Sequence, residues 1–250
     1  MDALKFTLSG KTAFFKKPEV NTYYYFTYGN IHKVALLGIL GAINGYAGYN
    51  QQANSKDLVY PEFYEKLKSI KVGIVPQNDN GYIAKKIQVF NNSVGYASQE
   101  QGGNLIVKEQ WLEKPIWDIY ILIQGDMERE LANRITNLRF EYIPYLGTND
   151  HIANITNIEI LQDIKKLDNV EKVHSLFIKH DFEFIKIDDD FDDINDEYIE
   201  PYKYEEMLPI ALEVKTNNYV LDTFVYTNSN LRCLNKCLIY ECNGKSIYFF

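Results

Sequence analysis

Residues 29–46, GNIHKVALLGILGAINGY, restrict the possible folds of this chain more than any other segment. We predict a helix over residues 30–44. Because apolar residues occupy every face of it, other elements must cover it on more than one side. Gly38, Gly41 and Gly45 make one thin stripe along the helix, which predicts the close approach of a sheet or of another backbone. We therefore expect further layers around this helix.

The first turn of this helix has an unusual charge. His32 and Lys33 lie there, and no acidic residue accompanies them. A helix N-terminus behaves like about half a positive charge, so a cation at this place costs about 0.3 to 1 kcal/mol unless an anion is present. The free N–H groups after Asn30, the helix dipole, His32 and Lys33 together predict a phosphate site.

The order of the elements predicts an α+β fold. It fits a ferredoxin-like unit over residues 1–162, with a long polar insertion at 77–104 whose centre, 85–90, is strand-like. Insertions of this kind are usually functional or disordered. Residues 163–250 predict a small, strand-rich second part that contains the acidic loop 181–206. The strands expected in the first part lie at 3–15 (with a turn at 9–10), 71–76, 104–112, 116–125 and 152–161, and its second long helix lies at 126–138.

Charge is distributed unevenly along the chain. The formal net charge of the 250 residues is -8. Residues 1–50 nevertheless hold five lysines against Asp2 and Glu19, whereas residues 181–206 hold twelve acidic residues against two lysines. A basic N-terminal segment and an acidic segment near the C-terminus indicate a local site for a polyanion and a face that repels polyanions. A scatter of solvated charges is the alternative.

The sequence indicates a cytoplasmic protein without a membrane segment. The N-terminal residues MDALKFTLSG lack the basic region and apolar core of a secretory signal. The longest apolar run, residues 34–43, is about half of what a bilayer requires. Cys233, Cys237 and Cys242 are an odd number of cysteines, and we expect them to be reduced thiols.

Sequence motifs for cofactors and metals do not fit. The tripeptide GKT at residues 10–12 resembles the end of a phosphate-binding loop, but the first glycine of that motif would fall on Lys5. A calcium loop starting at Asp188 would need glycine where Asp193 stands and glutamate where Ile199 stands. We therefore expect no metal and no cofactor.

Lysines and aromatic residues alternate over residues 11–33. Cations that neutralise phosphates beside rings on which bases stack are what the binding of single-stranded RNA or DNA requires. We expect Phe15, Tyr24 and Phe26 in the core, whereas Tyr23, Tyr25 and Tyr28 face either the core or a base. The residues of this block predicted to contact RNA are Lys11, Lys16, Lys17, Tyr23, Tyr25, Tyr28, Gly29, Asn30, His32 and Lys33.

Two segments carry a resemblance to a known family. Residues 9–46, SGKTAFFKKPEVNTYYYFTYGNIHKVALLGILGAINGY, resemble the opening of the fifth CRISPR-associated family, the repeat-associated (RAMP) subunit of type I effector complexes, and most of all its type I-B branch. Residues 142–155, YIPYLGTNDHIANI, are similar to a second signature of that branch. The resemblance spans most of residues 5–155, and the last hundred residues match only in being rich in strands.

The resemblance implies a ferredoxin-like (RRM-like) subunit that binds the repeat-derived 5′ handle of CRISPR RNA (crRNA) and caps one end of the effector complex in antiviral defence. Residues 77–104 then correspond to the thumb of the family, and Lys85, Lys86 and Phe90 are its expected RNA contacts. A surface loop without a role in RNA binding is the alternative. Asn149 and His151 of the second signature join the expected contacts. The implied partners are crRNA, the backbone (family seven) subunit and the large (family eight) subunit.

Different classes of function remain open. In the type I-C branch the relative itself cuts precursor RNA with a Tyr and a Lys-His pair, without a metal. Such chemistry needs a base, an acid and a cation. The Lys-His dipeptide of this chain, Lys179-His180, lies far along the chain beside the acidic loop. His32 and Lys33 are also adjacent, but in the reverse order. We expect a non-catalytic RNA-binding scaffold, with a metal-independent endoribonuclease acting on repeat RNA as the alternative and a protein-interaction module as the third possibility.

Overall fold

The computed structural model describes residues 1–19, 23–54, 59–185 and 200–250. Most of the predicted acidic loop, residues 186–199, lies outside the described ranges. The helices are α1 (Lys33–Asn44), α2 (Tyr49–Ala53), α3 (Glu62–Leu67) and α4 (Asp126–Thr136), and short 3-10 helices are η1 (Asp79–Gly81), η2 (Ala97–Gln99) and η3 (Lys179–Asp181). The strands are β1 (Asp2–Gly10), β2 (Thr12–Ala13), β3 (Val72–Pro76), β4 (Lys85–Asn91), β5 (Ile106–Glu113), β6 (Ile116–Ile123), β7 (Ala153–Leu161), β8 (Lys165–Lys166), β9 (Phe177–Ile178), β10 (Phe182–Phe184), β11 (Lys203–Leu212), β12 (Tyr219–Thr227), β13 (Leu231–Cys233), β14 (Leu238–Cys242) and β15 (Lys245–Phe249).

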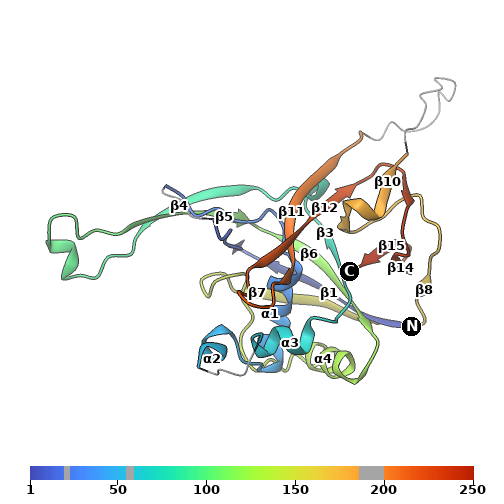
Figure 1. Ribbon diagram of the computed structural model, residues 1–250, viewed down its shortest axis with the longest axis horizontal. Helices are drawn as coiled ribbons and strands as arrows, with labels where there is room; N and C mark the ends of the chain where they lie inside the picture. The colour runs from blue at the N-terminus through green and yellow to red at the C-terminus, as the bar shows by residue number, and fades with distance from the viewer. Residues whose placement is uncertain (20–22, 55–58, 186–199) are drawn as a thin grey trace.

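The main sheet has four antiparallel strands in the order β3-β6-β1-β7. Leu4, Phe6 and Leu8 alternate with less buried residues along β1, so they point to one face of this sheet. Helices α1, α3 and α4 lie on that side (Figure 1). Helix α1 packs against the sheet, α3, α4 and β11, which confirms that it is covered on more than one side.

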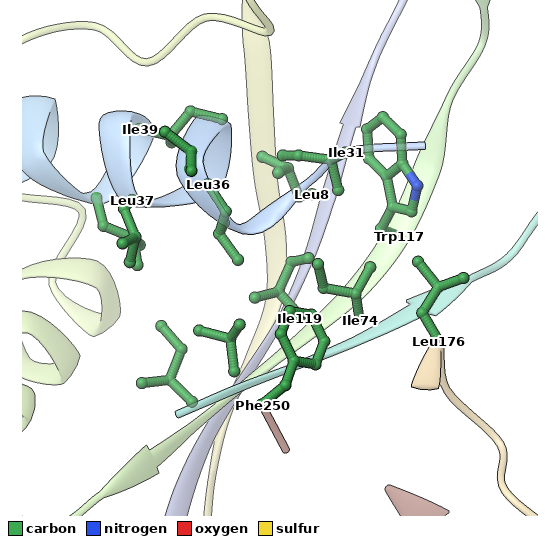
Figure 2. Packing of buried hydrophobic residues seen from close by; sticks show 14 of the residues in the cluster. Leu8, Ile31, Leu36, Leu37, Ile39, Ile74, Trp117, Ile119, Leu176 and Phe250 are labelled. Carbon is green, nitrogen blue, oxygen red and sulfur yellow. The ribbon is translucent and has the colours of Figure 1, made fainter. Parts of the chain in front are cut away.

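One continuous core joins the first and the second part of the chain. Leu8 and Leu36 lie close to each other there, and Leu176 and Phe250 come to the same region from beyond residue 163 (Figure 2). The backbone of Phe250 also pairs with β3, because it exchanges two N–H···O hydrogen bonds with Val72, of 3.1 and 3.2 Å. The second part thus completes the interior of the first.

The other face of the main sheet has a smaller core. Ala3, Val75 and Tyr120 from the sheet are buried against strands β14 and β15, which contribute Tyr240 and Ile247. These strands cover only one end of the face. At the other end the residues are polar, as on β1, where Thr7 donates a hydrogen bond to Asp118 (2.7 Å).

The predicted insertion is a long hairpin arm. Strand β4 coincides with the predicted strand-like centre, but its partner is β5, which continues beyond residue 104. Residues 104–112 therefore belong to the arm and not to the main sheet. The arm reaches far from the body of the molecule, to the left of Figure 1, and only its base is joined by β2 and by residues around Tyr25.

Helix α1 begins at Lys33, three residues later than predicted, and its N-cap is His32. The three glycines of the predicted stripe serve different purposes. At Gly41 a Cβ would lie 2.4 Å from the Cβ of Phe63, so the predicted close approach is confirmed there, and the neighbour is α3. Gly45 ends the helix in the left-handed conformation with φ of 79°, whereas Gly38 faces open space.

In the described ranges, no helix has the length and apolar character needed to cross a membrane.

Candidate nucleic-acid interface

The predicted phosphate site at the start of α1 is buried. Asn30, His32 and Lys33 all lie in the interior. The side chain of Asn30 donates to Gly81 O (3.1 Å), and Lys33 Nζ donates to Phe250 O (3.0 Å). The side-chain donors of Asn30 and Lys33 are therefore satisfied by residues that are distant in sequence, and they do not face solvent.

A carboxylate of the protein lies beside the segment that was expected to hold the anion. Glu206 on β11 accepts a hydrogen bond from Gly29 N–H (2.8 Å) and one from the hydroxyl of Tyr204 (2.5 Å). Lys17 Nζ lies 3.0 Å from its other oxygen. The side chain of Glu206 is only 15% exposed. Because residues 29–33 are buried, the prediction that they hold a phosphate is wrong, whereas Lys17, a predicted RNA contact, is half-buried and paired with Glu206.

His32 is neutral in the folded protein. Burial lowers the pKa of His32 to about 3. Its Nδ1 caps helix α1 by accepting a hydrogen bond from Ala35 N–H (3.2 Å). A neutral imidazole has one donor and one acceptor nitrogen, so the proton of His32 lies on Nε2. His32 is thus a hydrogen-bond donor and not the cation that the sequence suggested.

A groove of about 800 Å³ lies beside α1. This volume is typical of ligand sites, which hold about 300 to 1,000 Å³. Helices α1 and α2, residues 14–16 and residues 142–148 form its walls. Tyr142 is 59% exposed, and Tyr49 and Tyr145 are also exposed, so these rings are open to solvent. The tyrosines that line the groove are Tyr46, Tyr49, Tyr142, Tyr145 and Tyr219.

Small residues on one flank of α1 leave the room for this groove. Ala35, Gly38 and Ala42 follow one another at helical spacing and all line it. At Gly38 an added Cβ would meet nothing within 4 Å. Across the groove, Gly147 has a φ of 97° and lies so close to Phe14 that an added Cβ would be 1.8 Å from the carbonyl oxygen of Phe14. The loop 142–148 is thereby held against residues 14–16.

The groove meets a cation and an aromatic ring at its edge. Lys16 lines the groove and its Nζ lies 3.8 Å from the ring centre of Tyr25. The backbone of Tyr25 pairs with the arm, since its N–H donates to Lys108 O and its carbonyl accepts from Gln110 N–H, both at 2.9 Å. The edge of the groove is therefore continuous with the base of the arm.

One face of the arm continues this surface. Lys86 and Trp111 are cross-strand partners, and Lys86 Nζ lies 6.0 Å from the Trp111 ring centre. Lys86 Nζ also lies 3.4 Å from a carboxylate oxygen of Glu113, in an ion pair open to solvent that contributes little and that a phosphate can replace. The ring of Phe90 lies 6.5 Å from Trp111 on the same face. His151, from the loop after residue 142, contacts Trp111 edge to face at 4.5 Å. Lys85 points to the opposite face because side chains alternate along a strand.

The structure divides the predicted RNA contacts into two groups. Tyr23, which is 75% exposed, and Tyr25 lie at the surface, whereas Tyr28 is 2% exposed and belongs to the core. Phe26 is exposed although it was expected in the core, Tyr24 is half-buried, and the core position expected for Phe15 is confirmed. The predicted contacts that are exposed or half-buried are Lys11, Lys16, Lys17, Tyr23, Tyr25, Lys85, Lys86, Phe90 and Asn149, and the buried ones are Tyr28, Gly29, Asn30, His32, Lys33 and His151.

Sequence reasoning missed the tyrosines of the groove and Trp111. Tyr142 and Tyr145 lie within the second signature segment, so their sequence position carried a signal. Trp111 lies in a predicted strand, but its neighbours Lys86 and His151 depend on a strand register that the sequence does not give.

The Lys-His pair considered for RNA cleavage lies in the second part of the chain. Lys179 Nζ is 2.7 Å from a carboxylate oxygen of Glu205, and His180 Nδ1 is 3.4 Å from one of Asp222. Both side chains thus face acidic partners, and neither lines the groove. Within the described ranges, no group of three or more His, Cys, Asp or Glu side chains is placed to hold a metal.

Comparisons with known proteins identify the fold. No model of a protein family matches the sequence, and no curated protein matches it. A chain of a CRISPR RNA-guided surveillance complex superposes with a TM-score of 0.50 at 9% identity, over 93% of this chain and 91% of that one. A CRISPR protein from Archaeoglobus fulgidus superposes with a TM-score of 0.51 at 10% identity, over 99% and 98%. At such low identity the similarity shows the fold alone, and this fold is found in CRISPR-associated proteins.

Proposed function

We propose that this chain is a non-catalytic RNA-binding subunit of a type I CRISPR effector complex, of the fifth family and its type I-B branch, and that it caps the 5′ handle of crRNA. In this proposal the sheet β3-β6-β1-β7 with its helices is the ferredoxin-like domain, and the β4–β5 arm is the thumb. The fold shared with a chain of a CRISPR RNA-guided surveillance complex supports this assignment. The resemblance of residues 9–46 and 142–155 supports it independently.

The observation that carries the proposal is a continuous surface of cations and aromatic rings. It begins in the tyrosine-lined groove, passes Lys16 and Tyr25 at its edge, and continues over Lys86 and Trp111 on the arm. Single-stranded nucleic acid is bound by such surfaces, because cations neutralise its phosphates and rings stack on its unpaired bases. The surface combines Lys16 and Tyr25 with residues of the arm and of the loop 142–151, so it exists only in the folded chain.

The partners follow from the same proposal. A two-stranded hairpin is marginally stable in water, and most of the arm contacts nothing else within the described chain. Ile87 and Val89 are exposed on the face of the arm opposite to Trp111. We therefore propose that the arm lies between crRNA and the neighbouring backbone subunit. The large subunit is a further proposed partner in the complex.

Binding to repeat-derived RNA tests the proposal. The purified protein should retain or bind small RNAs that share one 5′ end, and its affinity should decrease steeply with salt. Charge reversal by Lys16→Glu with Lys86→Glu should weaken binding and reduce the slope of log K against log salt by about one to two. Lys165→Glu with Lys166→Glu, both exposed on β8 at the other side of the main sheet, is the control with the same change of charge. Equal affinities of all three proteins would overturn the proposal.

A further inference from the structure

We infer that the groove beside α1 is a pocket for a single nucleobase, to which His32 Nε2–H donates a hydrogen bond. This inference rests on the proposed function and specifies which part of the RNA the groove receives. It replaces the phosphate that the sequence suggested with a neutral ligand.

The orientation of the His32 ring supports the inference. His32 is 2% exposed and lines the groove. Its Nδ1 is held by Ala35 N–H, which leaves Nε2 with the proton. Within the described part of the chain no hydrogen bond to Nε2 is formed, and Nε2 is not one of the fully buried side-chain atoms that lack a partner, so it is accessible at the groove wall. A fixed N–H donor at a groove wall is suited to an acceptor atom of a base, such as a ring nitrogen or a carbonyl oxygen.

The charge of the groove does not favour a phosphate. Lys16 and Glu62 are its charged lining residues, and they carry opposite charges. Glu62 accepts a hydrogen bond from Ala47 N–H (2.9 Å) and pairs with Lys66 (3.0 Å), and these bonds lower its pKa, so it stays ionised. A carboxylate in the wall repels a phosphodiester but not a neutral base. The backbone of the RNA is thus expected at the Lys16 edge, with a base turned inward.

Aromatic rings around His32 supply the flat apolar contacts that a base needs. The Tyr219 ring lies 5.2 Å from the His32 ring, and the Phe15 ring lies 6.0 Å from it. Tyr219 and Phe15 both line the groove, and neither is exposed. Stacking of a base on such rings contributes to RNA affinity and tolerates any sequence. A peptide partner would not need this combination of one fixed donor and several ring faces.

Two variants separate the groove from the stability of the fold. His32→Asn retains a side-chain acceptor at the N-cap, where asparagine is among the preferred residues, but its amide is shorter than the imidazole, so its N–H groups do not reach the position of Nε2 in the groove. Gly38→Leu fills the groove from a position where an added Cβ meets no neighbour within 4 Å and where leucine favours the helix more than glycine does. Thr136→Leu, at an exposed position of α4 outside the groove, is the matched control.

The experiment measures the affinity of these proteins for 5′-handle RNA in which each position in turn is abasic. We expect one position at which base removal weakens binding to the wild type about tenfold, as expected for one stacked and hydrogen-bonded base. His32→Asn should weaken binding to intact RNA about three- to tenfold and have no further effect on RNA that is abasic at that position. Gly38→Leu should lose a similar or larger factor, and Thr136→Leu should change nothing.

The outcomes distinguish this inference from the proposed function. If the wild type binds the RNA, but His32→Asn and Gly38→Leu bind it equally well, the base pocket is wrong while RNA binding stands. If the effect of His32→Asn is the same on intact RNA and on every abasic RNA, His32 does not contact a base. If the wild type binds no handle RNA, both proposals are overturned. Unfolding midpoints of the variants show that any loss of binding occurs in folded protein.

Discussion

Replacement of Glu206 by alanine is expected to lower the free energy of unfolding by about 2 to 5 kcal/mol. The variant leaves the buried N–H of Gly29 without its acceptor at 2.8 Å, which costs about 1 to 3 kcal/mol. The half-buried hydroxyl of Tyr204 loses its acceptor as well, for about 1 kcal/mol. The ion pair with Lys17 adds at most about 1 kcal/mol, because Lys17 is 31% exposed.

Two further variants sharpen this prediction. Glu206→Gln retains an oxygen that can accept from Gly29 N–H but removes the charge, so it should cost only about 1 to 2 kcal/mol. Glu205→Ala is the matched control. The carboxylate of Glu205 pairs with Lys179 and Lys203 at the surface, so it should contribute at most about 1 kcal/mol.

Urea unfolding monitored by tryptophan fluorescence gives these free energies, provided that the dependence on urea concentration has the same slope in all variants. The predicted order of stability is wild type, Glu205→Ala, Glu206→Gln and Glu206→Ala. If Glu206→Ala costs no more than Glu205→Ala, the carboxylate does not satisfy a buried amide and our account of the helix start is wrong.

Further predictions concern α1 and the chemistry of the chain. Gly38→Ala should raise the free energy of unfolding by up to about 1 kcal/mol. Gly41→Ala should lower it by about 1 to 3 kcal/mol, because the added Cβ would collide with α3. Urea midpoints of the two variants that move in the same direction would contradict this. The pKa of His32 is about 3 when folded and about 6.5 when unfolded, so the stability that it contributes is present above pH 6.5 and is lost as pH falls toward 3. His32→Asn should make the decrease in stability over this window shallower, and an unchanged pH dependence would show that His32 is not neutral in the folded state. Repeat RNA incubated with the protein in EDTA should stay intact; cleavage that is lost in His32→Ala or His180→Ala would instead favour the metal-independent endoribonuclease.

The sequence predicted the elements of the first part well because their signals are local. The apolar helix after residue 30, the amphipathic helix at 126–138 and the strands of the main sheet appear close to the predicted ranges. Hydrophobic periodicity and helix caps depend on neighbours within a few residues, so they can be read without the fold. The hairpin partner of β4 was not predicted, since nothing local distinguishes a strand of the arm from a strand of the sheet.

The phosphate site failed for the opposite reason. Unpaired cations at a helix start indicate an anion, and an anion is indeed present next to it, but it is the carboxylate of Glu206, 177 positions away from Gly29. His32 was read as a cation because its pKa in water is near neutrality, and only its burial under later strands makes it neutral. Contacts between distant residues thus decide the charge of His32 and the partner of Gly29 N–H.

The hydrogen bonds between Phe250 and Val72 indicate that the two parts of the chain cannot be produced as separate polypeptides. A gene cut after codon 162 would encode a first piece whose sheet and helices lack Leu176, Phe224 and Phe250, which are buried against them. Such a piece would expose a large apolar surface and aggregate. The second piece would lose the residues of the first part against which its apolar side chains pack. Split versions of the protein would regain their shape only by reassociating, and a fusion partner is better attached outside these two segments than between them.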